Sequence, residues 1–169
     1  MKPKTPENSK TIQTDIVLPA DTNSLDNLFG GELLARMDKV ASIAAIKHSE
    51  QIVVTASINN VAFGEPVPNG SILTIEAKVS RAFNTSMEVF IDVWKQNKTH
   101  KKRVKVNEAI YTFVAVSKNG KTVKVPPLIP ETELEKKRFD AALRRRQLSL
   151  VLAGKMKANE ATELKAIFD

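Results

Sequence analysis

Residues 23–38, NSLDNLFGGELLARMD, hold an amide, two glycines and a carboxylate at spacings that suit acid–base chemistry. Gly30 and Gly31 precede an apolar helical pattern, so backbone N–H groups at the helix start would be free to bind a developing oxyanion. Asn27 carries an amide that can orient a water molecule or a carbonyl group. Asp38 borders the apolar side of the same helix, where a partly desolvated carboxylate suits a general base or a nucleophile. Together these residues supply the parts needed for acyl transfer or hydrolysis.

Each of these residues also fits an ordinary structural role, and the residues alone leave both interpretations open. Asp38 can hydrogen-bond to a backbone amide or an arginine, a Gly-Gly pair is often only a turn, and Asn27 is a good helix cap. The chain has no G-x-S-x-G motif and no phosphate-binding loop. It has no cysteine and only two histidines, His48 and His100, so we expect no metal site.

The elements that must position these residues follow from hydrophobic periodicity. Apolar residues recur at helical spacing from Leu33 through Ala44, and much of this helix is alanine, so a sheet can wrap closely around it. Period-two alternation and turn residues predict the strands. We expect five strands, over residues 11–19, 51–59, 71–80, 86–95 and 104–117.

Two of these segments carry further predictions. Residues 51–59 are apolar on both faces, which is typical of a buried central strand. The motif SKNG at 117–120 predicts a hairpin into a further strand over 121–125.

The C-terminal part returns to a helical pattern. Thr132 and Glu135 are spaced as a capping box at the start of a helix, and a second short helix is expected at about 155–168. The predicted fold class is therefore α+β, an antiparallel sheet wrapped around one long helix. We divide the chain into a disordered start over 1–10, one domain over 11–128 and a helical extension over 129–169.

The net charge of +7 invites a nucleic-acid hypothesis, but the excess is local. Residues 95–105 hold six basic side chains and no acidic one. Such a cluster is typical of a solvated loop, and it also suits a phosphorylated ligand or a polynucleotide. The longest apolar stretches are too short for a membrane span and no signal peptide is visible, so we expect a cytoplasmic protein without a membrane span.

Four longer segments resemble a known family. They are DTNSLDNLFGGELLARMDKVASIAA, VVTASINNVAFGEPVPNG, ILTIEAKVSRAFNTSMEVFIDVW and EAIYTFVAVSKNGK. Their motifs and order resemble single-domain hotdog-fold acyl-CoA thioesterases, which are related to cytosolic and brain acyl-CoA hydrolases. The resemblance implies a sheet wrapped around a central helix, a dimer as the minimal active unit, and commonly a hexamer that is a trimer of dimers. It implies hydrolysis of the thioester in acyl-CoA to a fatty acid and CoA, with CoA as part of the substrate and no separate cofactor.

The resemblance also assigns roles to individual residues. Asp38 matches the family's general base or nucleophile, and Asn27 matches the amide that positions the water or the thioester. Gly30 and Gly31 match the glycines whose N–H groups would polarise the thioester carbonyl. Asn27 of one subunit is expected to face Asp38 of its partner. Contacts with the substrate are implied for Val54, Thr55, Ala56, Arg81, Thr85 and Ser86.

One residue departs from the family pattern, because Asp26 stands where many relatives have glycine. An extra carboxylate at this place would suit a second hypothesis, a non-catalytic protein of the same fold that binds acyl-CoA. The third hypothesis, binding of nucleic acid, rests on charge alone, because the aromatic pairs used to stack on bases are absent. The sequence therefore favours an acyl-CoA thioester hydrolase.

Overall fold

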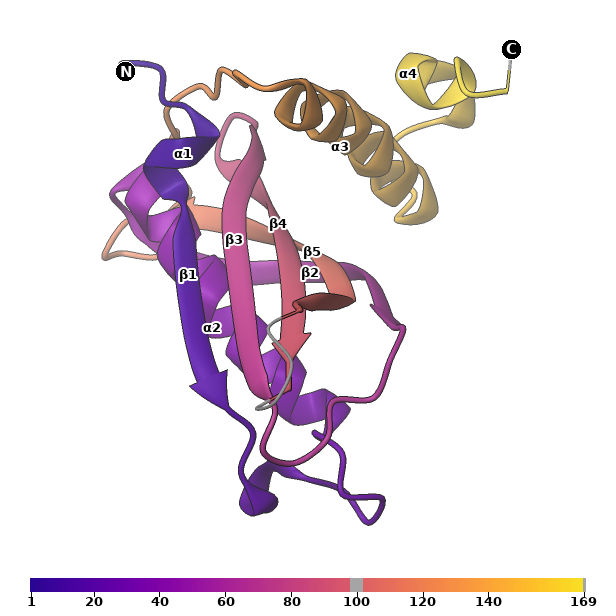
Figure 1. Cartoon of the computed structure of the whole chain (residues 1–169). Coiled ribbons are helices and arrows are strands. Elements are labelled where there is room, and N and C mark those ends of the chain that lie inside the picture. Colours follow the sequence, from indigo (N-terminus) through magenta and orange to yellow (C-terminus); the bar gives the residue numbers. More distant parts are fainter. Residues whose placement is uncertain (98–101, 169) are drawn as a thin grey trace.

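A computed structural model describes residues 1–97 and 102–168 (Figure 1). Five antiparallel strands form one sheet in the order β1-β3-β4-β5-β2, and the long helix α2 (Gly30–Ser49) contacts all five strands. The strands are β1 (Thr11–Ile16), β2 (Ile52–Phe63), β3 (Ile72–Ala82), β4 (Ser86–Gln96) and β5 (Val104–Val116). The helices outside the sheet are α1 (Pro6–Ser9), α3 (Glu133–Leu152) and α4 (Thr162–Lys165), with short 3₁₀ turns at Pro19–Asp21 and Ala158–Glu160.

The core lies between α2 and the inner face of the sheet, and this confirms the predicted α+β hotdog fold. Along β3 and β4 every second residue points inward and is fully buried or nearly so, as the alternation predicts. On α2, Ala41, Ala44 and Ala45 have no exposed surface. Their small side chains allow the strands to pack close to the helix backbone.

Strand β2 is an edge strand, so the prediction of a buried central strand over 51–59 was wrong. It pairs only with β5, and Ile52, Val54, Ile58 and Phe63 are 43–56% exposed. An apolar pattern on both faces is the same for a central strand and for an edge strand that another molecule covers. In a single chain, β2 therefore presents an apolar free edge.

The first ten residues form an ordered segment where the sequence predicts disorder. Lys4 donates its backbone N–H to Pro127, and its Nζ caps the C-terminal end of α2 through the carbonyl oxygens of Lys47 and His48. Ser9 is buried and accepts a hydrogen bond from the N–H of Val79. A polar composition alone does not reveal that these groups have partners on the rest of the chain.

Other boundaries also differ from prediction. After β5 the expected hairpin turn forms, with the N–H of Ser117 bonded to Lys121 and a bridge from Val116 to Thr122, but within the described residues it does not lead into a further strand. The second C-terminal helix is shorter than predicted and comprises Thr162–Lys165.

The capping box of α3 is confirmed, because Thr132 accepts from the N–H of Glu135 and the Glu135 carboxylate accepts from that of Thr132. Within the described residues, no helix is both long and apolar enough to cross a membrane.

Asp26, the departure from the family pattern, has a left-handed backbone with φ of 58°. Glycine adopts this conformation without strain, and aspartate is among the few other residues that tolerate it. The side chain of Asp26 is exposed, and its nearest hydrogen-bond donor is the hydroxyl of Thr22. The backbone conformation therefore explains both glycine and aspartate at this position.

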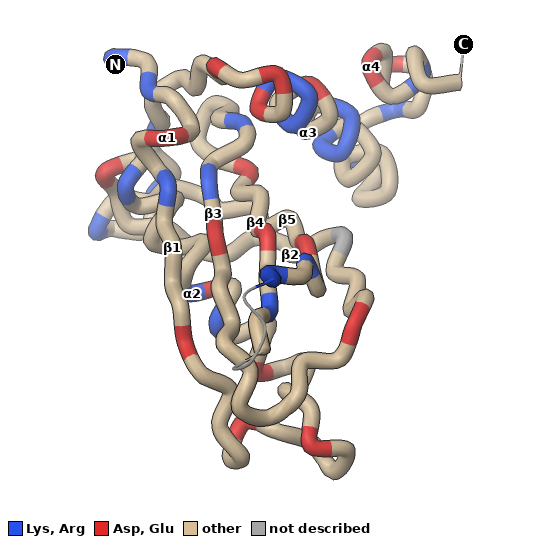
Figure 2. The backbone as a smooth tube through the Cα atoms, in the orientation of Figure 1, with Lys and Arg blue, Asp and Glu red and all other residues tan. Residues whose placement is uncertain are grey.

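Helix α3 lies on the outer face of the sheet, on the side opposite α2, and is held there by arginines (Figures 1 and 2). Arg145 makes two hydrogen bonds to the buried carboxylate of Glu88, at 2.9 and 2.7 Å. Arg138 pairs with Asp92 at 2.8 Å and lies 3.7 Å from the centre of the Phe90 ring. These charged contacts act together with apolar ones, because Phe139 of α3 packs against the core and Ala142 is fully buried.

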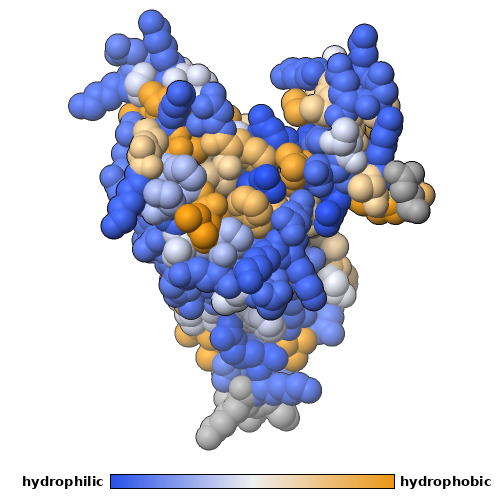
Figure 3. Space-filling model, turned by 90° about the horizontal axis from the view of Figure 1, so that it is seen from above, coloured by the Kyte–Doolittle hydropathy of each residue, from blue (hydrophilic) through white to orange (hydrophobic). Residues whose placement is uncertain are grey.

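Seen from above, the surface is mainly hydrophilic, with apolar side chains gathered between two projecting lobes (Figure 3).

The attachment of α3 can be tested with Arg145→Ala. Among the described residues, this change leaves the Glu88 carboxylate, whose side chain is 5% exposed, with only the hydroxyl of Ser80 as a donor. We expect the free energy of unfolding in urea to fall by about 3 kcal/mol. Lys136→Ala removes an exposed ion pair with Glu133 in the same helix and should cost less than about 0.5 kcal/mol. Equal losses in the two variants would contradict this account of α3.

Candidate active site

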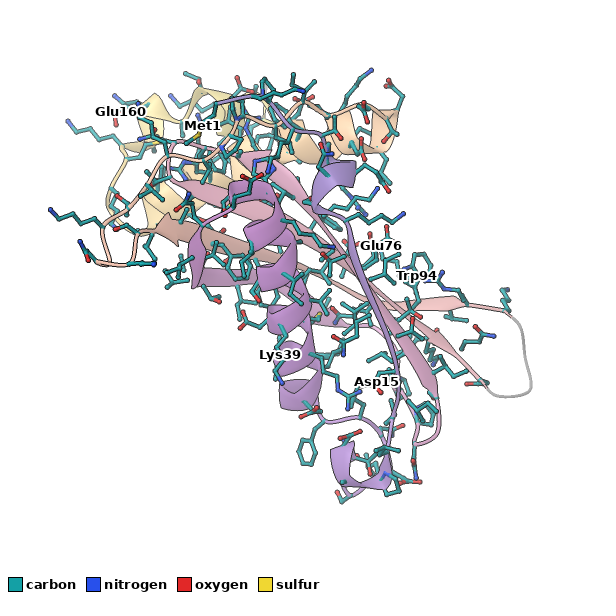
Figure 4. All side chains as sticks on the ribbon, turned by 90° about the vertical axis from the view of Figure 1, so that its left-hand side faces the viewer. Met1, Asp15, Lys39, Glu76, Trp94 and Glu160 are labelled. Carbon is teal, nitrogen blue, oxygen red and sulfur yellow. The ribbon has the colours of Figure 1, made fainter. Side chains whose placement is uncertain are left out.

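Asp38 lies in the middle of α2 and faces the edge strand β2. Its Oδ1 accepts a hydrogen bond from the hydroxyl of Thr55 at 2.8 Å. The pairing of β2 with β5 is shifted between Thr55 and Ser57, so Ala56 is an extra residue at a bulge beside the carboxylate. Lys39, the neighbour of Asp38, lies on the side of α2 away from Asp15 of β1 (Figure 4). Among the described residues, Thr55 is the only hydrogen-bond donor to Asp38, and Oδ2 is left open.

The first turn of α2 offers backbone donors. Phe29, the N-cap residue, provides no side-chain cap, and the first bond within the helix runs from the N–H of Leu33 to Phe29. The N–H groups of Gly30, Gly31 and Glu32 have no acceptor among the described residues. Three free N–H groups at the positive end of a 20-residue helix form a favourable place for a developing negative charge.

The two glycines have different surroundings. A Cβ atom on Gly30 would lie 3.1 Å from the Phe63 ring, so glycine at this position allows the ring to lie against the helix start. A Cβ atom on Gly31 would meet nothing within 4 Å. A side chain at Gly30 would therefore push on the Phe63 ring, while Gly31 leaves space above the helix end.

A hollow of about 430 Å³ opens beside this helix start. It is bounded by the loop before α2 and by the loop after β2, which are joined by hydrogen bonds from Leu28 to Val67 and from Asn69 to Asp26. Its walls are mainly apolar, with asparagines on one side. The lining residues are Asn23, Leu25, Asn27, Leu28, Gly30, Leu33, Phe63, Gly64, Glu65, Pro66, Val67 and Val106.

Two asparagines line this hollow, and their amides differ. The Oδ1 of Asn23 accepts from the N–H groups of Leu25 and Asn27, at 2.9 and 3.3 Å, which fixes the orientation of its amide. Its Nδ2 has no acceptor within the described part of the chain. The Nδ2 of Asn27 instead donates to the carbonyl of Leu25 at 3.0 Å. Asn23 thus has the more available amide, and sequence reasoning missed it, although its place in the turn DTNS was a signal.

The sequence-predicted residues are not all brought together in one chain. Gly30, Gly31 and Asn27 lie at the start of α2, while Asp38 is eight residues further along. At 1.5 Å per residue the two groups are about 12 Å apart along the helix axis. Asp38 is therefore not within reach of its own helix start, and one chain does not contain a complete site.

The residues predicted to bind substrate fall into two groups. Val54, Thr55 and Ala56 are exposed on the free edge of β2, beside Asp38. Arg81, Thr85 and Ser86 lie at the other end of the sheet, near α3. The guanidinium of Arg81 donates to the Phe139 carbonyl at 2.8 Å, and the hydroxyl of Ser86 accepts from Arg146 at 3.1 Å. Thr85 is bonded through its carbonyl to Ala115.

Burial also marks Arg81 as a structural residue. Its guanidinium lies 4.0 Å from the centre of the Phe139 ring, and this burial lowers the pKa of Arg81. Arg146 stacks on Phe83 at 4.2 Å and has no carboxylate partner within the described residues. Arg144 also has no carboxylate partner in the described part of the chain, so both arginines are available to an anion. The basic loop at 95–105 falls partly outside the described residues.

Comparisons with known proteins agree with this geometry. Residues 25–102 match the Thioesterase superfamily. The uncharacterized acyl-CoA thioester hydrolase YkhA of Bacillus subtilis is 39% identical over 137 residues, which is 81% of this chain and 80% of that protein. The human cytosolic acyl coenzyme A thioester hydrolase is 34% identical over 141 residues, 82% of this chain and 37% of the human protein.

Solved structures are similar over almost the whole chain. A hexameric acyl-CoA thioesterase superposes with a TM-score of 0.87 at 39% identity, covering 90% of this chain and 98% of its own. An acyl-CoA hydrolase from Staphylococcus aureus, in complex with butyryl-CoA and CoA, superposes with a TM-score of 0.82 at 35% identity. The match covers 96% of this chain and 98% of the hydrolase chain. Further structures of that hydrolase have alanine in place of an aspartate, an asparagine or a threonine.

The difference between the two glycines predicts opposite results for two alanine variants. Gly31→Ala should raise the free energy of unfolding by roughly 0.5–1 kcal/mol, because alanine favours the helix and meets no obstacle. Gly30→Ala should gain less or lose stability, because the Phe63 ring must move. Urea denaturation of both variants measures this difference, and a larger gain from Gly30→Ala would refute the packing argument.

Proposed function

Because the chain belongs to the thioesterase superfamily, among the hotdog-fold acyl-CoA thioester hydrolases, we propose that it hydrolyses fatty acyl-CoA with Asp38 as the general base. The chain is an acyl-CoA thioester hydrolase; the catalytic residues and the preferred acyl group are the proposal. The observation that carries it is the carboxylate of Asp38, held by Thr55 at the apolar free edge of β2.

The geometry supports a direct attack by water. Thr55 fixes one oxygen of Asp38 and leaves the other to accept a proton from water. The water oxygen then bonds to the thioester carbon, and the negative charge that develops on the carbonyl oxygen is stabilised by the free N–H groups at a helix start. The C–S bond breaks as the proton passes from Asp38 to the departing sulfur, which yields the acid and CoA. In the alternative, Asp38 itself attacks the carbonyl carbon, the C–S bond breaks to release CoA as the thiolate, and water then hydrolyses the resulting anhydride to the free acid and the Asp38 carboxylate.

We infer that Asn23 supplies the positioning amide, a role that the sequence assigned to Asn27. In the Staphylococcus aureus hydrolase, the replaced asparagine and aspartate are 15 residues apart, and the threonine follows after another 17. Asn23, Asp38 and Thr55 have the same spacing in this chain. The free Nδ2 of Asn23 supports this choice, while Asn27 is used within the loop.

The active unit is then a dimer, because Asp38 and the helix start of one chain lie too far apart to act on one thioester. Pairing of two β2 edges covers the exposed apolar side chains of that strand and extends the sheet across both subunits. Asp38 of one subunit would then face Asn23 and Gly30 of its partner. Since three structural relatives are described as hexamers, we propose a hexamer built from three such dimers.

The remaining predictions concern the substrate and its surroundings. We propose that the thioester lies along Val54, Thr55 and Ala56. The rest of CoA is proposed to lie near Arg81, Thr85 and Ser86. Arg146, which bonds to Ser86, would be an additional contact there. CoA is part of the substrate, and the expectations of no metal, no separate cofactor and no nucleic-acid partner stay predictions. A cytoplasmic location stays a prediction too, and a human relative is named cytosolic.

A panel of acyl-CoAs of increasing chain length, assayed with a thiol reagent, tests the proposed reaction. We expect turnover of at least one chain length and a loss of 10³-fold or more, on the order expected for a removed general base, in Asp38→Ala. Asp26→Gly is the matched control, because it relieves the left-handed backbone and leaves Asp38 unchanged. Tight binding of acyl-CoA without hydrolysis would instead support the non-catalytic alternative.

Mixed oligomers test the position of the site and the identity of the amide. Asn23→Ala and Asp38→Ala proteins should each be inactive alone. When equal amounts are unfolded and refolded together, about half of the dimers are mixed, and one of the two sites in each mixed dimer is intact. The mixture should therefore regain about a quarter of wild-type activity. Asn27→Ala should keep most of its activity. Activity that is lost in Asn27→Ala and kept in Asn23→Ala would restore the original assignment, and no recovery in the mixture would place both groups in one chain.

A further inference from the structure

Tyr111 is a buried hydroxyl that the proposed reaction does not use. It lies on β5, has no exposed surface, and is one of the largest fully buried side chains. Its inward-facing neighbours on the strand are Ala109, Phe113 and Ala115, so the phenol oxygen is the one polar side-chain atom in that row of four residues. Burying a hydroxyl costs free energy unless it makes a hydrogen bond, and phenylalanine would fill the same volume.

The partner of this hydroxyl is a backbone carbonyl of α2. The oxygen of Tyr111 donates to the carbonyl of Leu34 at 3.1 Å. In an α-helix this carbonyl also accepts from the N–H four residues later, which belongs to Asp38. Because the Leu34 carbonyl already accepts a hydrogen bond within the helix, it does not need a second one from Tyr111. The bond ties the turn that carries Asp38 to the sheet.

Strand β2, which pairs with β5, holds the carboxylate of Asp38 itself. Thr55, the donor to Asp38, is paired across the sheet with Phe113, whose ring stacks on that of Tyr111 with 6.3 Å between the centres. Burial, together with the charge of Asp38, raises the pKa of Tyr111 to about 12, so its hydroxyl keeps its proton at any physiological pH. The hydroxyl is therefore always able to donate to the Leu34 carbonyl.

We propose that Tyr111 is a positioning residue for Asp38, fixing the Leu34–Asp38 turn against β5 while Thr55 fixes the carboxylate from β2. The inference rests on the proposed function. A general base must be held within a fraction of an ångström, and a displacement of about 1 Å can cost 10²-fold in rate. Two attachments, one on the backbone and one on the side chain, leave the carboxylate little freedom.

The test is Tyr111→Phe, with Ser49→Ala as the matched control. Ser49 is also buried and donates its hydroxyl to a carbonyl of α2, that of Ala45 at 2.8 Å, but it lies 11 residues beyond Asp38. Both variants should lower the melting temperature by a few degrees. In Tyr111→Phe, kcat should fall about tenfold or more with KM nearly unchanged, while Ser49→Ala keeps the wild-type kcat. An unchanged kcat in Tyr111→Phe, or an equal loss in both variants, would overturn the proposal.

Thr55→Val supplies a second measurement. If Tyr111 and Thr55 hold the same carboxylate, the loss of kcat in the double variant Tyr111→Phe with Thr55→Val is smaller than the product of the single losses. Losses that multiply would show independent roles and refute the proposal. A wild-type protein that turns over no acyl-CoA would refute the proposed function and this inference together, whereas an active wild type with a fully active Tyr111→Phe refutes the inference alone.

Discussion

The close contact between the small residues of α2 and the inner face of the sheet is the constraint on which the rest of the molecule depends. Ala41, Ala44 and Ala45 leave no room for larger side chains, since each is fully buried against the strands. The helix is thereby held near the backbone of β5 and β2, and Asp38 comes within hydrogen-bond distance of Thr55. A bulkier helix would stand further from the sheet and would lose this contact.

Sequence patterns predicted the parts of the fold that depend on local periodicity. The alternation in β3 and β4 and the capping box at Thr132 are properties of neighbouring residues, so they could be read directly. The position of β2 in the sheet could not be predicted in this way, because an apolar pattern does not tell whether a neighbouring strand or another subunit covers the edge. The ordered start of the chain was missed for a similar reason, since the partners of Lys4 and Ser9 are distant in sequence.

The candidate site shows the same limit. Asp38 and the two glycines were found from their types and spacing, and the structure gives them a consistent environment. Asn23 and Asn27 are four residues apart in one loop, and only the hydrogen bonds distinguish a free amide from a bonded one. Arg81 and Ser86 are polar residues at the expected place in the sheet, yet they bond to α3, a helix more than fifty residues later in the chain. Two basic side chains of α3, Arg138 and Arg145, attach the helix to carboxylates of the sheet.

The apolar edge of β2 also affects how the protein is made. Before the proposed dimer forms, each chain exposes this edge, and unpaired, apolar strand edges are the surfaces through which proteins aggregate. Correct assembly and aggregation therefore compete for the same row of backbone N–H and C=O groups. The bulge at Ala56 interrupts that row in the middle of the strand, so it favours a partner with a matching irregularity, which a second copy of this chain has.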